Sequence, residues 1–165
     1  MCIRDRAIPG QVGLEHRIGG LEKGEDGGVS YDPDNHEEMT RLRAEKVAGI
    51  SKSFDPLEVR GEPEGDLLVI GWGGTYGAIS SAVGNLRDEG FSVSSVHLRY
   101  INPLPDELGD LMSRFKKVIV PELNLGQLAM VLRAKYLVDI ISYGKVQGKP
   151  FKVSELREKF IEHLN

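Results

Sequence analysis

Short apolar runs alternate with segments of helical period over residues 66–165. Leu67–Trp72 is a nearly continuous apolar run of strand length, which is typical of a strand covered on both faces. Further strands are expected at 91–98, 118–120 and 138–142. Apolar positions spaced by three and four predict helices at 76–89, 105–115, 126–137 and after Ser154, which is expected as an N-cap. Because parallel strands need crossover connections, this alternation predicts an α/β domain with three layers and a mainly parallel sheet flanked by helices.

The preceding region, residues 7–65, differs in composition and is predicted to be an irregular connecting arm. It is rich in Gly, Pro, Asp and Glu, which argues against regular structure. One helix is expected from Asn35 to about Gly49, with Asp34 or Asn35 as its N-cap. Residues 51–65 are interpreted as a linker. The opening residues 1–6 match nothing else in the chain and are interpreted as a non-native scar that precedes a truncated reading frame.

Charge and cysteine content narrow the classes of function. The formal net charge is −4 and charges of both signs are interspersed, so a basic footprint for nucleic acid is absent. No apolar run approaches the roughly 18 residues of a membrane helix, and the N-terminus has no signal-peptide core, so a cytoplasmic protein is expected. The single cysteine, Cys2, excludes an internal disulfide and an iron–sulfur cluster, which takes about four thiolates.

A glycine-rich turn follows the first predicted strand. Gly73, Gly74 and Thr75 join that strand to the N-terminus of the next helix, where backbone N–H groups favour an anion. The spacing matches neither the dinucleotide fingerprint nor the P-loop. The alternative is a tight turn that needs glycine so that helix and strand approach each other. The sequence is compatible with both interpretations, an anion site and a tight turn.

A polar segment follows the strand at 118–120. Glu122, Asn124 and Gln127 stand at the carboxyl end of that strand, where ligands gather in open α/β sheets. These side chains are candidates for contact with a ligand or with the active site of a partner subunit. In the alternative reading, Asn124 caps the next helix and Glu122 is solvated.

The remaining polar residues predict little chemistry. The spacing of Glu15, His16, Asp26, Asp32 and His36 matches no metal-ligand pattern, so no metal site is expected. His97 lies in a predicted strand and is expected to be packed or hydrogen-bonded. No nucleophile–base arrangement is present, so no catalytic residue is assigned to this chain.

Several segments resemble known enzymes. Val118–Glu122 with Gly126–Leu128, and also His97–Pro103, resemble the C-terminal domain shared by transketolase-like thiamine enzymes. Further segments resemble the alpha subunits of 2-oxoacid:ferredoxin oxidoreductases of the 2-oxoglutarate type. These segments are Gly13–His16, Ser30–Pro33, Asn35–His36, Gly71–Gly77 and Glu122–Leu128. The resemblance covers residues 9–165. It departs at Arg17–Gly20, where an acidic pair is expected after the histidine.

The resemblance implies that the chain is the C-terminal part of such a subunit. The complete enzyme would oxidatively decarboxylate 2-oxoglutarate to succinyl-CoA and pass electrons to ferredoxin. Thiamine diphosphate with Mg and the [4Fe-4S] clusters would be held elsewhere, so this segment would bind no cofactor and would be inactive alone. Its partners would be the cognate beta subunit and the remainder of the alpha subunit, with ferredoxin and coenzyme A at the level of the complex, and neither nucleic acid nor membrane.

The expected role of this segment is assembly and the edge of the active site, through Glu122, Asn124 and Gln127. Three alternatives stay open: the same role for pyruvate or another 2-oxoacid, a phosphate-ligand-binding module that uses residues 73–75, and a non-catalytic dimerisation module.

Overall fold

The computed structural model describes residues 8, 10–15 and 19–164. The chain divides into two compact units, residues 1–49 and 50–165, which are described separately. The expectations about residues 1–6, His16, Arg17 and Ile18 lie outside the described residues.

Helix α1, Pro33–Ala48, is the main element of the first unit. Asp32 is its N-cap, since the Asp32 carboxylate accepts hydrogen bonds from the N–H groups of Asp34 (2.8 Å) and Asn35 (3.4 Å). Pro33 occupies the first helical position, for which its fixed φ is suited. The predicted start at Asn35 and the predicted caps were therefore wrong by two or three residues. None of the side chains of α1 is buried within this structure.

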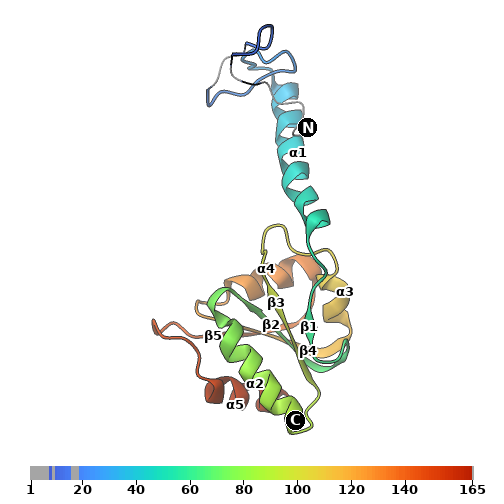
Figure 1. Ribbon diagram of the computed structural model, residues 1–165, viewed down its shortest axis with the longest axis vertical. Coiled ribbons are helices and arrows are strands. Elements are labelled where there is room, and N and C mark those ends of the chain that lie inside the picture. Colours follow the sequence, from blue (N-terminus) through green and yellow to red (C-terminus); the bar gives the residue numbers. More distant parts are fainter. Residues whose placement is uncertain (1–7, 9, 16–18, 165) are drawn as a thin grey trace. The chain divides into compact units, whose positions relative to one another are not determined.

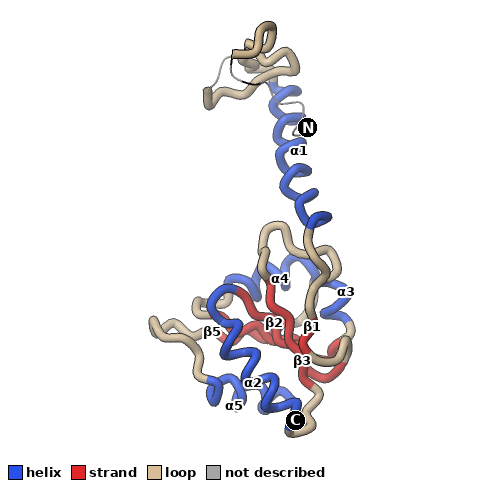
Figure 2. Tube along the Cα trace, viewed as in Figure 1, coloured by secondary structure: helices blue, strands red, loops and turns tan. Residues whose placement is uncertain are grey.

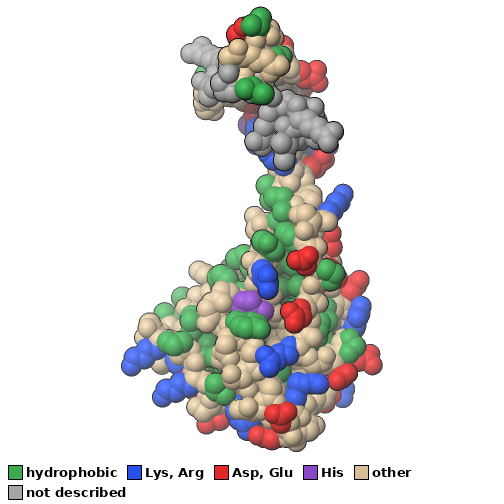
Figure 3. Space-filling model, in the orientation of Figure 1, with side chains coloured by type: hydrophobic (Ala, Val, Ile, Leu, Met, Phe, Trp, Pro, Cys, Tyr) green, Lys and Arg blue, Asp and Glu red, His purple; other side chains and the backbone are tan. Residues whose placement is uncertain are grey.

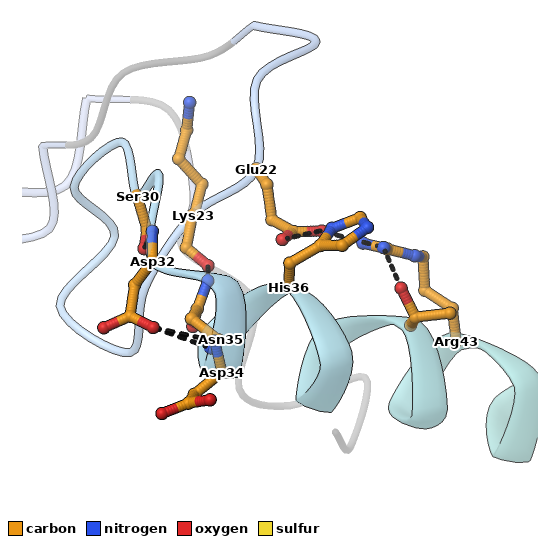
Figure 4. Close-up of polar contacts among 9 residues, drawn as sticks. Glu22, Lys23, Ser30, Asp32, Asp34, Asn35, His36 and Arg43 are labelled. Carbon is orange, nitrogen blue, oxygen red and sulfur yellow. Dashed lines mark hydrogen bonds and ion pairs between the residues drawn. The ribbon is translucent and has the colours of Figure 1, made fainter.

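A cluster of polar contacts links the segment before α1 to the helix (Figure 4). The carboxylate of Glu22 lies 3.0 Å from His36 Nδ1 and accepts a hydrogen bond of 2.8 Å from Arg43 Nη2. This bond from Arg43 is the main reason that the pKa of Glu22 is held below its usual range. The Asn35 amide donates to the carbonyl of Lys23, which forms a β-bridge with Val29. Among the described residues of the first unit, these polar contacts hold the segment before α1 against the helix.

The second unit is built on a five-stranded sheet with the order β1-β3-β2-β4-β5. Its four longer strands are parallel neighbours: β2 Gly65–Trp72, β3 Val93–Leu98, β4 Phe115–Glu122 and β5 Ile140–Gly144. The two-residue strand β1, Val59–Arg60, pairs with β3 in the antiparallel sense. It lies in the stretch expected as a linker, as does most of the 3₁₀ helix η2, Gly49–Ser53. The predicted mainly parallel α/β class is confirmed.

Helices cover both faces of this sheet (Figures 1 and 2). Two pack on one face, α2 Tyr76–Asp88 and α5 Val153–Leu164; two pack on the other, α3 Leu108–Ser113 and α4 Gln127–Tyr136. Strand β2 is covered on both faces, which explains its continuous apolar run. Leu67 and Val69 belong to the α2–α5 core, and Leu68 and Ile70 belong to the α3–α4 core. Ser154 was wrongly expected as a cap, since α5 already begins at Val153.

The order of connections creates a switch point between β2 and β4. The chain leaves β2 through η3, Gly73–Thr75, and α2, toward one face of the sheet. It leaves the neighbouring strand β4 through α4, toward the opposite face. Neighbouring strands whose connections part in this way leave a crevice outside their carboxyl ends. In the described part of the chain, no helix is long and apolar enough to cross a membrane.

Candidate functional site

The turns that follow β2 and β4 line one small pocket at this switch point. Its volume is about 170 Å³, and its walls are Trp72, Gly73, Gly74, Thr75, Leu123 and Asn124. Four of the six candidates from the sequence are therefore brought together: the three residues of the glycine turn and Asn124. Glu122 lies beneath the turn and is fully buried, and Gln127 is exposed on the first turn of α4.

The Glu122 carboxylate ties the two strand ends and α4 together. Its Oε1 accepts hydrogen bonds from Leu128 N (2.9 Å), Asn124 Nδ2 (3.1 Å) and Trp72 Nε1 (3.3 Å), and its Oε2 accepts one from Ala129 N (3.1 Å). A negative charge at the positive end of α4 is favourable there. The expected alternative of a solvated Glu122 is wrong. Glu122 itself fills the anion position at the N-terminus of α4.

Asn124 holds the turn that leads into α4. Its Oδ1 accepts hydrogen bonds from Gly126 N (2.7 Å) and Gln127 N (3.1 Å) and closes the turn before the helix. The expectation that Asn124 caps α4 was wrong, because the N-cap is Gly126. Gly126 has a φ of +87°, and a Cβ at this position would collide with the Ser142 hydroxyl. Among the described residues, the Gln127 side chain has no hydrogen-bond partner and is free to contact another molecule.

The glycine turn is closed by Thr75. The Thr75 hydroxyl accepts a hydrogen bond from Trp72 N (3.1 Å) and donates one to the Trp72 carbonyl (2.8 Å). Thr75 is buried, so the side of the pocket formed by this turn is mainly the backbone of Gly73 and Gly74. Gly73 has a φ of +55°, which favours glycine, but a Cβ on Gly73 or Gly74 would meet nothing within 4 Å, so the approach of helix and strand does not require these two glycines. The turn leaves their backbone groups at the pocket.

A larger cavity, of about 770 Å³, lies on the α2 side of the sheet beside β1 and β3. His97 lines it and packs edge-on against Tyr76, with ring centroids 5.0 Å apart. Burial lowers the pKa of His97 and the charge of Arg99 lowers it further, so the imidazole is neutral at neutral pH. The lining comes from separate stretches of chain around residues 53–60, 76–80 and 95–105, so no sequence spacing pointed to this cavity.

Metal ligands are not grouped in the described part of the chain. Within residues 8, 10–15 and 19–164, no three His, Cys, Asp or Glu side chains are placed to hold a metal ion. The single cysteine of the sequence also does not fit an iron–sulfur cluster, which takes about four thiolates.

Comparison with known proteins places the second unit in a family. The family model described as "Pyruvate:ferredoxin oxidoreductase core domain II" matches residues 65–156, which include β2 to β5 and both turns of the switch-point pocket. The chain belongs to the pyruvate:ferredoxin oxidoreductase core domain II family. Domain II therefore supplies the four parallel strands, the glycine turn and the Glu122 network.

Curated relatives carry domain II within longer subunits. The 2-oxoglutarate oxidoreductase subunit KorA of Mycobacterium tuberculosis is 53% identical over 156 residues, which are 93% of this chain and 23% of that protein. The 2-oxoglutarate synthase subunit KorA of Methanocaldococcus jannaschii is 30% identical over 147 residues, 87% of this chain and 39% of that protein. This chain thus spans well under half the length of either relative.

Solved structures agree with the family and the fold. The 2-oxoglutarate:ferredoxin oxidoreductase of Magnetococcus marinus, solved with 2-oxoglutarate, coenzyme A and succinyl-CoA bound, matches 96% of this chain and 28% of its own chain. Its TM-score is 0.90 at 34% identity. A split-gene transketolase matches 67% of this chain and 42% of its own chain, with a TM-score of 0.51 at 20% identity, which shows the fold alone. The resemblance to 2-oxoglutarate-type subunits and the transketolase-like fold are confirmed.

Trp72 is the residue of domain II that the sequence reading missed. It was placed at the end of an apolar strand and within the Gly71–Gly77 segment but was not named as a site residue, yet its indole donates to Glu122 and it lines the switch-point pocket. A tryptophan directly before a glycine pair was the available signal. Its partner, 50 residues further along the chain, could not be identified from the sequence.

Proposed function

We propose that this chain acts as domain II of the alpha subunit of a 2-oxoglutarate:ferredoxin oxidoreductase. The assembled enzyme would decarboxylate 2-oxoglutarate oxidatively, form succinyl-CoA and pass electrons to ferredoxin. The observation that carries the proposal is the TM-score of 0.90 over 96% of the chain to an enzyme solved with 2-oxoglutarate, coenzyme A and succinyl-CoA bound. The relatives from M. tuberculosis and M. jannaschii, both 2-oxoglutarate enzyme subunits, support the same substrate.

The role of domain II in this proposal is to build one wall of a larger site and to hold it rigid. A pocket of about 170 Å³ is smaller than the roughly 300 Å³ at the lower end of ligand sites, so other parts of the enzyme would complete it. Glu122 would keep the β2 and β4 turns in fixed relation, while Gln127 and the backbone of Gly73 and Gly74 would contact the ligand or the neighbouring domain.

The surface around this pocket supports an interface. Leu125 is 89% exposed and Met130 is 64% exposed, and Leu123 and Val131 are also exposed beside them in sequence. Large apolar side chains that stay exposed this close together in the sequence favour contact with another protein surface. The remainder of the alpha subunit and the cognate beta subunit are the partners that the proposal assigns to this surface.

The cofactors of the proposed enzyme are assigned to other parts of the complex. Thiamine diphosphate supplies the carbanion chemistry when it is bound in such enzymes. The described residues of this chain do not fit a magnesium or iron–sulfur site, because their potential ligands are not grouped and only one cysteine is present in the sequence. This chain is therefore assigned no chemical step of the reaction.

An enzyme assay tests the proposal. The complete alpha subunit that carries this chain is co-expressed with its beta subunit, and reduction of a viologen dye is followed with 2-oxoglutarate or pyruvate, with and without coenzyme A. We expect reduction that depends on both 2-oxoglutarate and coenzyme A. A folded, cofactor-loaded complex that turns over no 2-oxoacid would refute the enzyme assignment.

Pyruvate is the second candidate substrate. It is favoured by the family description, which names pyruvate:ferredoxin oxidoreductase for residues 65–156. A higher kcat/KM for pyruvate than for 2-oxoglutarate in the same assay would keep the family assignment and change the substrate.

A further inference from the structure

We propose that the larger cavity of the second unit, beside β1, β3 and α2, binds a nucleoside diphosphate. This inference does not rest on the proposed enzyme function, because it uses only the side chains that line the cavity. These all lie within residues 53–105. The cavity, of about 770 Å³, falls within the roughly 300–1,000 Å³ of small-molecule sites.

Two arginines provide the phosphate contacts. Arg60 comes from β1 and Arg99 follows β3, and the side chain of neither makes an ion pair or a hydrogen bond with another described residue. A guanidinium group matches phosphate oxygens with two parallel donors.

The two arginines join the cavity lining at different points along β3. Arg60 pairs with Ser95 of β3, and its Nη2 lies 3.9 Å from the place that a Cβ on Gly84 of α2 would take. Arg99 follows the end of β3, and its charge lowers the pKa of the His97 imidazole. Two separated cations suit negative charge that is spread over more than one phosphate, which favours a diphosphate over a monophosphate.

Two carboxylates in the same cavity select against inorganic phosphate alone. Asp55 and Glu58 line it, and in the described structure neither is paired with Arg60 or Arg99. Carboxylates repel free phosphate, but they accept hydrogen bonds from ribose hydroxyl groups, as acidic residues do in dinucleotide sites. A surface view of the α2 side likewise shows acidic and basic side chains interspersed (Figure 3). The mixed charge therefore favours a ligand that carries both phosphates and a sugar.

Aromatic rings complete the set of contacts. Tyr76 is 57% exposed and Tyr100 is 53% exposed, and both line the cavity. Tyr100 is held by a stacked ring, Phe54, at a centroid distance of 4.2 Å, and Tyr76 is held by His97. Rings that are fixed on one side and exposed on the other are suitable platforms for a base.

The test is calorimetric titration of the 165-residue chain with ADP, AMP, adenosine and inorganic phosphate. We expect saturable binding of ADP that is stronger than binding of the other three. Arg60→Gln and Arg99→Gln should each weaken ADP binding on the order of tenfold, the effect of losing a hydrogen bond to a charged group. The control is Arg114→Gln, an exposed arginine outside the cavity lining, which should leave ADP binding unchanged.

Coenzyme A carries the same nucleotide at one end and serves as a further ligand in this titration. Tighter binding of coenzyme A than of ADP would identify the nucleotide end of a larger cofactor as the occupant, and the reverse would identify a free nucleotide. His97 ring signals in NMR spectra give a second readout and should shift on addition of ADP. Absence of saturable ADP binding by the folded chain, or ADP binding that both arginine variants retain in full, would overturn the proposal.

Discussion

At the scale of single residues, Glu122 has a structural role that was not predicted from the sequence. A buried carboxylate is unfavourable unless hydrogen bonds replace its lost water, and Glu122 receives four of them, two from the backbone of α4. Because Trp72 is one of the donors, the carboxylate also joins β2 to the turn after β4. The stability of domain II should therefore be sensitive to this one charge.

The substitution Glu122→Gln tests that role. The amide keeps one acceptor oxygen but places an NH₂ group where Oε2 accepts from Ala129 N, so a charged hydrogen bond is lost and a buried donor is left unpaired. We expect the free energy of unfolding to fall by about 2–3 kcal/mol. Urea denaturation followed by the fluorescence of Trp72, the single tryptophan, measures the change.

The matched control for this substitution is Glu158→Gln. Glu158 is exposed on α5 and has no ion pair among the described residues, so its replacement should change the free energy of unfolding by less than about 0.5 kcal/mol. If the Glu122 variant were as stable as this control, the hydrogen-bond network would have no structural importance.

At the scale of elements, the approach of the turn after β4 to strand β5 depends on glycine. A Cβ on Gly144 would lie 2.5 Å from the backbone carbonyl of Asn124, which is part of the switch-point turn. Backbone cannot move aside as a flexible side chain can, so Gly144→Ala should lower the free energy of unfolding by about 1–3 kcal/mol. Thermal unfolding by circular dichroism measures it.

The comparison for Gly144 is Gly84→Ala within α2. A Cβ there meets only Arg60 Nη2 at an ordinary contact distance of 3.9 Å, and alanine favours the helix. We expect Gly84→Ala to raise the free energy of unfolding by about 0.5–1 kcal/mol. Equal effects of the two substitutions would show that the close approach at Gly144 is unimportant.

The loop between β5 and α5 is held by Lys145, which is buried. Lys145 Nζ donates hydrogen bonds to the Glu155 carboxylate (2.6 Å) and to the Pro150 carbonyl (3.1 Å). The hydrogen bond from Lys145 and a second from the Lys152 N–H hold the pKa of Glu155 below its usual value of 4.5. A lowered folded-state pKa means that the stabilisation is complete above the unfolded-state pKa and is lost as the pH falls through the folded value.

This loop gives a pH-dependent prediction. The stability advantage of the natural chain over Glu155→Gln should be constant near neutral pH and should shrink below about pH 4.5, as Glu155 takes up a proton. Unfolding midpoints of the two proteins, measured in parallel from neutral to acidic pH, provide the test. A difference that does not change with pH would argue against the ion pair.

The pattern of apolar positions was sufficient to predict β2 to β5 and the four α-helices of the second unit because these elements contribute to the buried cores, whereas β1 was missed. The run Leu67–Trp72 reflects contact with both cores, and the spacing of Ile79, Ala82, Val83 and Leu86 reflects contact with the α2–α5 core. The boundaries of the elements were predicted less well, because they do not coincide with the ends of the apolar runs. Strand β4 starts at Phe115, before the apolar run at 118–120, and α1 starts at Pro33 because the Asp32 side chain caps it.

The candidate site was only partly readable from the sequence, for a related reason. Local signals identified Gly73–Thr75 and Asn124, since turns and caps are short-range features. The link from Trp72 to Glu122 and the cavity beside His97 depend on how distant segments meet in the sheet. Such meetings follow from the strand order, which the pattern of apolar residues does not encode.

At the scale of the whole molecule, the central claim is that this chain does the work of domain II in a 2-oxoglutarate enzyme. The family match at residues 65–156 lies within a chain that is 53% identical to the M. tuberculosis subunit over 156 residues. At that identity the two domains should be interchangeable, provided that the surface around the switch-point pocket is the one that contacts the rest of the enzyme.

Domain exchange tests the claim most directly. Residues 65–156 of this chain replace the matching segment of the M. tuberculosis subunit, which is assembled with the other subunits of that enzyme and assayed for coenzyme-A-dependent reduction of a viologen dye by 2-oxoglutarate. The same exchange carrying Gly144→Ala serves as a destabilised control. We predict that the hybrid assembles and oxidises 2-oxoglutarate and that the control does so less. A hybrid that assembles and binds its cofactors but does not oxidise 2-oxoglutarate would contradict the assignment.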